Sequence, residues 1–302
     1  MSTRVFGSMM TMAAVVAVMS LAPVLAAGPT SHVTFVGVAE ASGGGAQEPR
    51  AAAKTWDPPR TRDGKPDLQG YWQPEVGTSY SIEDLGLQEI FQGAIEGFVP
   101  DARKEGKSRI VDPADGKIPY QPWAAAKHKE IFDHHTNPTP EQLDPQARCF
   151  LSGVPRPMYL PTQYQILQPD GYVVILYESN HSYRTIPLDG RPHIGTNIQL
   201  WMGDSRGRWE GNTLVVDTSH FNGKVWFDIV GDFQSDALHV VERFTLVNAD
   251  RIDYQATIED PTLYTRPWTL AVPIVRIKEK GYQIMEYACH EGNRAPDLML
   301  TR

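Results

Sequence analysis

The chain has 302 residues, of which 41% are hydrophobic and 21% are charged. Its 36 acidic and 28 basic residues give a formal net charge of −8 and are interspersed along the chain, which argues against nucleic acid as a partner. Beyond residue 26 there is no uninterrupted apolar run of the roughly eighteen residues that a membrane helix needs, so no membrane span is expected once residues 1–26 are removed.

Residues 1–26 have the pattern of a secretory signal peptide. A single basic residue, Arg4, precedes an apolar run over residues 9–25. Val24 and Ala26 then stand at the two positions where signal peptidases require small residues. The mature chain is therefore expected to be periplasmic or secreted.

Two segments are expected between the signal peptide and the main domain. Residues 27–54 are rich in Ala, Gly and Ser, so they predict a flexible linker. Residues 55–150 have scattered apolar positions and many prolines, and are predicted to wrap the rest of the protein without a core of their own. Helical spacing within this wrap predicts helices over Ser81–Phe98 and Tyr120–His135, with Pro122 in the first turn of the second. The histidines of the second helix are expected to lie at its solvated end.

Cys149 and Cys289 are the two cysteines of the chain. An exported protein enters an oxidising compartment, where an even number of cysteines usually forms bridges, so the pair predicts a disulfide. The alternative is a nucleophilic thiol next to a histidine, for which His290 is the neighbour in sequence.

Residues 151–302 change to short β-prone runs separated by Gly, Asp, Asn and Pro, with no helical period between them. Such meandering antiparallel strands either close into a barrel or stack as a sandwich, and the barrel is favoured. The expected fold is thus mainly β, an antiparallel barrel of about eight or nine strands with an irregular, partly helical N-terminal wrap. The expected strands are Tyr164–Gln168, Tyr172–Ser179, His181–Leu188, Trp209–Thr218, Val225–Ile229, Leu238–Asn248, Arg251–Glu259, Trp268–Lys278 and Tyr282–Cys289.

Two of these strands alternate clearly between apolar and polar residues. Arg251–Glu259 places its apolar residues on one face, which predicts one buried and one solvated side. In Leu238–Leu246 the apolar row is interrupted by Glu242. A carboxylate in a buried row is either a proton-transfer group or one half of an ion pair, for which Arg184 and Arg266 are the candidates.

Several strings of the sequence resemble those of a family of exported bacterial proteins, and the resemblance runs from about residue 58 to residue 291. It implies export but carries no activity. The string GRWEGNTLVV (207–216) is in addition similar to the opening strand of lipocalin-like barrels, so the expected barrel is lipocalin-like. The family strings include LDGRPH (188–193), WMGDSRGRWEGNTLVVDT (201–218), DALHVVERF (236–244) and YTRPW (264–268).

The stretch 171–193 places two histidines and a carboxylate beside the most β-prone run, and it is the candidate site. His181 and Glu242 are predicted to exchange protons, with Glu178 as a third catalytic residue. No metal or cofactor is expected, because no close spacing of histidines holds three ligands together. The residues expected to bind and orient a ligand are His193, Arg266, Trp268 and Tyr254.

Three functional hypotheses follow from these residues. The first is an exported barrel that binds a small aromatic, apolar or sugar-like molecule and performs acid/base chemistry on it, such as elimination, isomerisation or hydrolysis. The second is a non-catalytic lipocalin-like carrier, whose cavity would be lined almost entirely by apolar groups. The third is an envelope protein that docks a partner. The sequence leaves open whether the chain is an enzyme and what its oligomeric state is.

Overall fold

A computed structural model describes residues 56–85 and 108–300. The expected signal peptide and linker lie outside these residues, as does most of the helix expected over 81–98. No helix in the described part of the chain is long and apolar enough to cross a membrane.

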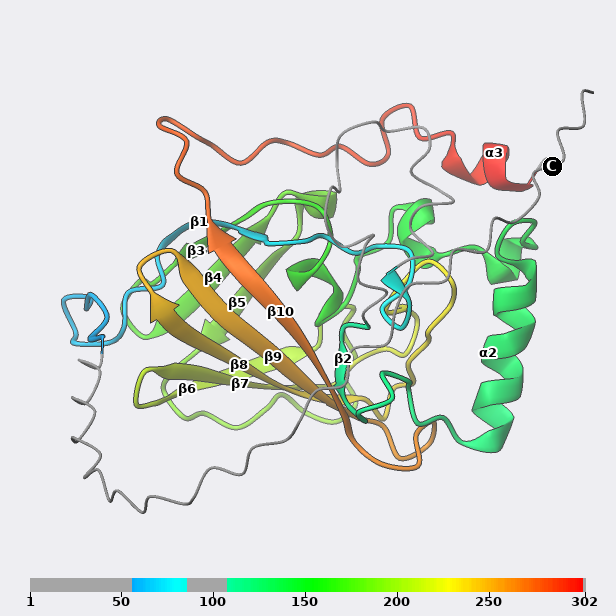
Figure 1. Cartoon of the computed structure of the whole chain (residues 1–302), viewed down its shortest axis with the longest axis horizontal. Helices are drawn as coiled ribbons and strands as arrows, with labels where there is room; N and C mark the ends of the chain where they lie inside the picture. Colours follow the sequence, from blue (N-terminus) through cyan, green and yellow to red (C-terminus); the bar gives the residue numbers. More distant parts are fainter. Residues whose placement is uncertain (1–55, 86–107, 301–302) are drawn as a thin grey trace, which may run out of the picture. The chain divides into compact units, whose positions relative to one another are not determined.

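Nine antiparallel strands form a nearly closed barrel (Figure 1). Around the wall the strands follow the order β5-β4-β3-β1-β10-β9-β8-β7-β6, and a further short strand, β2, pairs with β10. The mainly β, lipocalin-like barrel predicted from the sequence is therefore confirmed. The strands are β1 (Gly70–Pro74), β2 (Ile110–Asp112), β3 (Tyr164–Leu167), β4 (Tyr172–Tyr177), β5 (Tyr183–Pro187), β6 (Asp204–Glu210), β7 (Thr213–Ser219), β8 (His239–Asn248), β9 (Arg251–Glu259) and β10 (Trp268–Arg276).

The longest strands, β8, β9 and β10, show why the chain forms a barrel. Each alternates buried and more exposed residues along its length, so one side chain row faces the interior. The registers place these rows opposite each other, with Glu242 beside Ala256 and Phe244 beside Tyr254. The apolar rows read from the sequence are thus the inner face of the wall, and Glu242 lies in that face.

The strand β1 belongs to the barrel wall and corrects the expected boundary between wrap and barrel. It pairs with β3 on one side and with β10 on the other, so the barrel is not confined to residues 151–302. Trp72 in β1 is fully buried and donates from Nε1 to the carbonyl oxygen of Leu68 at 2.8 Å. Because β1 has only five residues, it covers part of β10, and β2 pairs with the remaining part. The sequence did not predict β1, because five residues among turn formers are too few to show the alternation of apolar and polar residues that marks a strand.

Three other expected strands differ from the structure. Trp209–Thr218 is divided by a turn at residues 211–212 into parts of β6 and β7. Val225–Ile229 is not a strand, since Phe227 N bonds within its own loop, to the oxygen of Asp232. Tyr282–Cys289 is likewise without strand structure. Neither Val225–Ile229 nor Tyr282–Cys289 therefore takes part in the strand pairing of the barrel.

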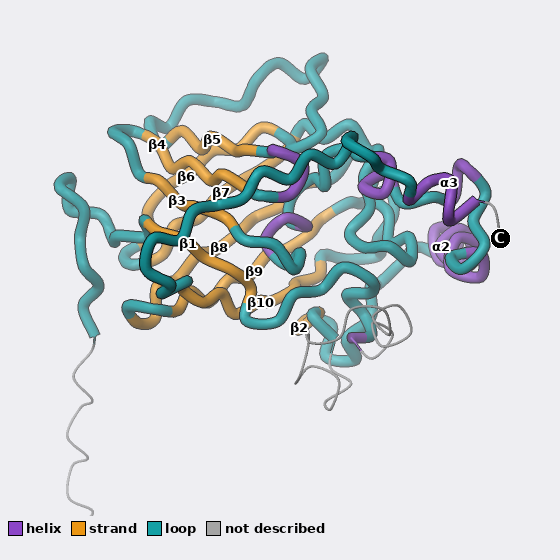
Figure 2. The backbone as a smooth tube through the Cα atoms, turned by 90° about the horizontal axis from the view of Figure 1, so that it is seen from above, coloured by secondary structure: helices purple, strands orange, loops and turns teal. Residues whose placement is uncertain are grey.

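The two α-helices of the described residues lie beyond one end of the barrel (Figures 1 and 2). The expected helix over 120–135 is confirmed as α2 (Pro122–His134), and a short helix, α3 (Ala295–Leu300), follows the last strand. At this end the strands are joined by the longer connections 178–182, 220–238 and 260–267, and we call it the loop end. The opposite end has the tight turns 168–171, 211–212 and 249–250.

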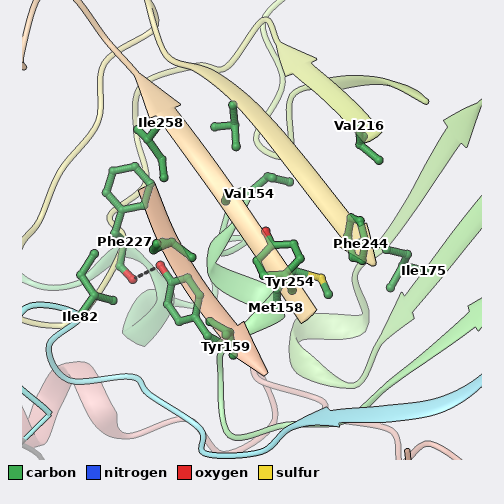
Figure 3. Packing of buried hydrophobic residues seen from close by; sticks show 14 of the residues in the cluster. Ile82, Val154, Met158, Tyr159, Ile175, Val216, Phe227, Phe244, Tyr254 and Ile258 are labelled. Atoms are coloured by element: carbon green, nitrogen blue, oxygen red, sulfur yellow. Dashed lines mark hydrogen bonds between the residues drawn. The ribbon is translucent and has the colours of Figure 1, made fainter. Parts of the chain in front are cut away.

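The barrel interior is filled by side chains that form one continuous apolar core. Residues outside the strands contribute to it, and Figure 3 shows Ile82, Val154 and Met158 packed among strand residues. Tyr159 donates a hydrogen bond from its hydroxyl to the carbonyl oxygen of Phe227 at 2.7 Å, which binds the segment before β3 to the β7–β8 connection.

The predicted disulfide between Cys149 and Cys289 is present, with the two Cα atoms 5.6 Å apart. Cys149 directly follows the short 3-10 helix η4 (Pro145–Arg148). Cys289 lies in the segment between β10 and α3 and not in a strand. The bond therefore joins the chain just before the main run of strands to the chain just after it.

Candidate functional site

The predicted acid/base residue Glu242 lies inside the barrel, with no exposed surface. Its Oε1 accepts hydrogen bonds from Arg184 Nη1 at 3.0 Å and from the Tyr254 hydroxyl at 2.8 Å. Its Oε2 accepts a further hydrogen bond from Arg184 Nη2. Of the two arginines considered from the sequence, Arg184 is thus the partner, and the pair is bidentate.

Arg184 connects the two strands at the edges of the sheet, β5 and β6. Its Nε donates to Ser205 Oγ at 2.8 Å, and its Nη2 donates to Thr218 Oγ1 at 2.7 Å. Burial alone would lower the pKa of Arg184, but the Glu242 carboxylate reverses this and raises it. On β6 an added Cβ at Gly207 would lie 2.7 Å from a methyl of Ile186, so only glycine lets the edges pack so closely. The Arg184–Glu242 pair therefore closes the barrel.

The other two predicted catalytic residues lie apart from Glu242. Glu178 is buried, and its Oε1 accepts hydrogen bonds from the Tyr282 hydroxyl and from Met285 N, each at 2.8 Å. It therefore anchors the segment after β10. His181 is half exposed, and its Nε2 is 3.7 Å from Glu286 Oε1. Within the described residues no hydrogen bond or ion pair joins His181 to Glu242.

The four predicted ligand-binding residues are also dispersed. Tyr254 belongs to the barrel interior with Glu242. Trp268 is fully buried and packs edge to face against neighbouring rings, while its Nε1 has no acceptor in the described part of the chain. Arg266 lies on the surface, where it forms two hydrogen bonds of 3.0 Å to Asp112. His193 lies in the β5–β6 connection and contacts carboxylates on the outer wall. The structure does not bring these residues into one site.

A pocket of about 320 Å³ lies among the segments that surround the loop end. None of its lining residues belongs to a barrel strand. They come from several separate parts of the chain, so only the folded protein assembles the pocket, which we call the end pocket. Its lining residues are Ser79, Asp144, Gln146, Ala147, Arg156, Leu160, Pro161, Thr162, Ile229, Tyr287 and Ala295.

The charged residues of the end pocket are Arg156 and Asp144, which neutralise each other. Arg156 Nη1 and Nη2 donate to the two carboxylate oxygens of Asp144 at 2.9 and 2.7 Å, and both side chains are almost fully buried. Burial lowers the pKa of Arg156, but the Asp144 charge outweighs it and the net shift is upward. Because the guanidinium is already paired, the pocket offers apolar walls and a few neutral polar groups to a ligand.

The disulfide holds two walls of the end pocket together. Ala147 lies two residues before Cys149, and Tyr287 lies two residues before Cys289. Asn293 adds a hydrogen bond of 3.0 Å from its Nδ2 to the carbonyl oxygen of Ala147. The shape of the pocket therefore depends on a bond that forms only in an oxidising environment.

Next to the pocket lining, the β7–β8 connection carries a buried carboxylate, Asp228. Its oxygens accept three backbone hydrogen bonds, from Ile82 N at 3.0 Å and from Gly231 N and Asp232 N at 3.1 Å each. Burial raises the pKa of Asp228 well above its usual value, and the nearby Asp232 charge raises it further. Asp228 thus joins the N-terminal segment, through Ile82, to the loop end. Its carboxyl group favours the protonated form.

A second buried carboxylate, Asp232, lies beside the first. Its Oδ1 accepts a hydrogen bond of 2.9 Å from the Tyr120 hydroxyl, while Oδ2 is buried without a hydrogen bond within the described residues. Burial raises the pKa of Asp232 to about 6. His128 of α2 places Nε2 at 3.1 Å from Asp232 Oδ1, although the ring is not aligned for a hydrogen bond, and stacks on the Tyr120 ring. We call Tyr120, His128, Asp228 and Asp232 the acid cluster.

The acid cluster has the composition of a proton-transfer site, since burial favours the protonated forms of two neighbouring carboxylates beside an imidazole. Burial lowers the pKa of His128, which favours its neutral form. The sequence did not reveal the cluster, because its pattern predicts a strand over residues 225–229. It also places His128 at the solvated end of a helix. Aspartates four residues apart in a glycine-containing loop are the only signal the sequence offered.

A scan against models of known protein families and a search of curated proteins each gave no match.

Proposed function

We propose that the chain is an exported protein that binds a small, neutral and largely apolar organic molecule in the end pocket. The proposal rests on the pocket itself, whose volume of about 320 Å³ lies at the lower end of the range of small-molecule sites. Leu160, Pro161 and Ile229 offer apolar contact area to such a ligand. Ser79 and Thr162 add hydroxyl groups that fix its orientation.

The packing of the barrel interior supports a ligand position outside the barrel. Its inward side chains form a continuous core around the Arg184–Glu242 pair, in contrast to the open apolar cavity of a lipocalin-like carrier. The barrel fold is compatible with small-molecule binding, but the ligand is proposed to bind beyond the barrel end.

Export to the periplasm or beyond is part of the same proposal. It is supported by the Cys149–Cys289 bond, because disulfides persist in oxidising compartments, and by the signal pattern of residues 1–26. Since the bond connects two walls of the end pocket, binding would be restricted to the exported, oxidised protein.

Acid/base chemistry on the bound molecule is a second candidate function. The observation that favours it is the contact of His128 with Asp232, whose pKa of about 6 lies near neutrality. The acid cluster and the pocket share one connection, since Ile229 of the lining directly follows Asp228. Conversion of a bound molecule by the wild type and not by Asp232→Asn would support this function.

The binding proposal is tested by filling the pocket. Ala147→Phe enlarges a partly exposed lining residue, and Ala126→Phe makes the same change on the exposed face of α2 as a matched control. The probe is the fluorescence of N-phenylnaphthylamine, a neutral apolar dye, titrated into the oxidised protein, together with native mass spectrometry of protein exported by its producing cell. We expect saturable binding that Ala147→Phe weakens about tenfold or more and Ala126→Phe does not change. Equal binding by both variants would refute the pocket as the site.

A further inference from the structure

We infer that the outer wall of the barrel carries a binding site for one divalent transition metal ion, held by His193, Asp204 and His220. The ligating atoms of these three side chains all lie within 4.8 Å of one another. None of the three belongs to the end pocket or to the acid cluster, so the site is independent of the proposed function.

The fold brings the three residues together at the loop end. Asp204 is the first residue of β6 and stands directly opposite Ser219, the last residue of β7. His220 follows Ser219, so its ring lies beside Asp204. His193 comes from the β5–β6 connection, which runs back along the outer wall, and its ring stacks on that of His220 with the centroids 5.6 Å apart.

Both ring nitrogens of His193 lie within hydrogen-bond distance of carboxylates, so a metal ion bound between His193 and Asp204 would take the place of the proton between them. Asp217 Oδ1 is 3.0 Å from Nε2 of His193, so a carboxylate orients the ring from behind. Nδ1 then faces Asp204 Oδ2 at 2.8 Å. A histidine held by a carboxylate through one nitrogen and facing the ion with the other is the usual arrangement in metal sites, because the carboxylate fixes the tautomer.

The other two ligands are also oriented by neighbours. Arg206 Nη1 donates to Asp204 Oδ1 at 2.8 Å, while Oδ2 accepts from Ile194 N at 3.1 Å and is the oxygen that faces His193 Nδ1. Ser219 Oγ is 2.8 Å from His220 Nδ1, so Nε2 of His220 is available. His220 has a φ of 61°, a left-handed conformation that is uncommon outside glycine. The chain therefore holds this histidine in an unfavourable backbone conformation at the place where its ring meets Asp204.

The ligand set indicates the class of ion. Two imidazole nitrogens and one carboxylate oxygen suit zinc and the neighbouring divalent transition metals, whereas calcium and magnesium prefer oxygen ligands alone. The three side chains are partly exposed, so one or more coordination positions would be left for water or another small ligand.

The test uses the oxidised exported chain without an added histidine tag, and zinc sulfate as the probe in isothermal titration calorimetry. We expect one zinc ion per chain, with affinity reduced roughly tenfold or more in His220→Asn, a change that retains a residue suited to the left-handed backbone. His193→Gln is the second variant and is expected to have the same effect. Cobalt(II) bound by the wild type should show the absorption of imidazole coordination, and this absorption should disappear in both variants.

The matched control is His181→Gln. His181 is also a left-handed, partly exposed histidine near a carboxylate, but it lies apart from the three ligands. Its replacement should leave the zinc affinity unchanged. Absence of stoichiometric zinc binding by the wild type, unchanged affinity in both ligand variants, or loss of binding in His181→Gln would each overturn the site.

Discussion

Two groups of buried carboxylates in this protein are satisfied in opposite ways. Inside the barrel, Glu242 is paired with Arg184, so charge is balanced and both carboxylate oxygens accept hydrogen bonds. At the loop end, Asp228 and Asp232 are equally buried, but their hydrogen-bonding and contact partners in the described residues are backbone N–H groups, a tyrosine hydroxyl and an imidazole.

The difference separates an anchor from a proton-holding group. A carboxylate paired with a buried guanidinium keeps its charge, and loss of either partner leaves the other buried and unpaired. Two carboxylates buried without a matching cation instead favour their protonated forms, because burial raises the pKa of both Asp228 and Asp232. Burial of an acid in an apolar row is therefore not sufficient to identify a proton-transfer residue, because the partner decides its role.

The largest expected effect is that of breaking the anchor. Glu242→Gln should lower the free energy of unfolding by about 3 to 5 kcal/mol, since Arg184 would remain buried without its counter-charge. Urea denaturation measures this change, with Glu130→Gln on the exposed face of α2 as the matched control. If the two variants were equally stable, the pair would not hold the barrel closed.

Removing the disulfide should affect the loop end and leave the barrel folded. The double change Cys149→Ser and Cys289→Ser should lower the free energy of unfolding by about 2 to 4 kcal/mol, because it releases a loop of 140 residues in the unfolded chain. Hydrogen exchange should then increase at Ala147 and in the segment around Asn293, while β8 and β9 stay protected. Increased exchange throughout β8 and β9 would contradict this division of the molecule.

The acid cluster should make stability depend on pH. The pKa of Asp232 is about 6 in the folded chain against 3.8 for an ordinary aspartate, so its protonated form stabilises the fold. This contribution, about 3 kcal/mol, is complete below about pH 4 and is lost as pH rises through about 6. Asp232→Asn should remove it, whereas Asp133→Asn on α2 should not.

Urea denaturation of both variants and the wild type between pH 4 and pH 8 measures this slope. His128, whose pKa burial lowers, contributes a slope of the opposite sign, since its stabilisation is lost as pH falls below about 6.5. Because His128 is present in all three proteins, the difference between them reports Asp232. Parallel pH profiles would contradict the raised pKa of Asp232.

The smallest effect is expected from the hydroxyl that contacts Asp232. Tyr120→Phe removes one hydrogen bond to the carboxylate and should lower the free energy of unfolding by about 1 to 2 kcal/mol at pH 7. Loss of this donor should also raise the pKa of Asp232 and move the pH-dependent loss of stability to higher pH. The exposed Tyr183→Phe serves as the control, and an identical pH profile for the two variants would remove Tyr120 from the cluster.

The strands that the sequence predicted best are those with a clear local period. Arg251–Glu259 and the run around Glu242 alternate strictly, so both the strand and the side that faces inward could be read from neighbouring residues. The five-residue strand β1 could not, because its place between β3 and β10 depends on residues about 100 and 200 positions away.

The candidate sites divide in the same way. The disulfide followed from two cysteines and an exported chain, since redox chemistry leaves them few alternatives. The sequence also indicated that Glu242 was either an acid or an anchor. It could not decide between them, because that choice depends on whether Arg184, 58 positions away, lies across the seam of the barrel.

By itself, then, the sequence determined the alternation of the long strands, the inward position of Glu242 and the pairing of the cysteines, all of which depend on local period or on chemistry without competitors. Only the tertiary structure decided which buried carboxylates are paired with cations. It also decided which segments line the end pocket, because Asp228, Asp232 and the pocket residues all lie outside the barrel strands. Strand order and hydrogen bonds between distant segments bring them together.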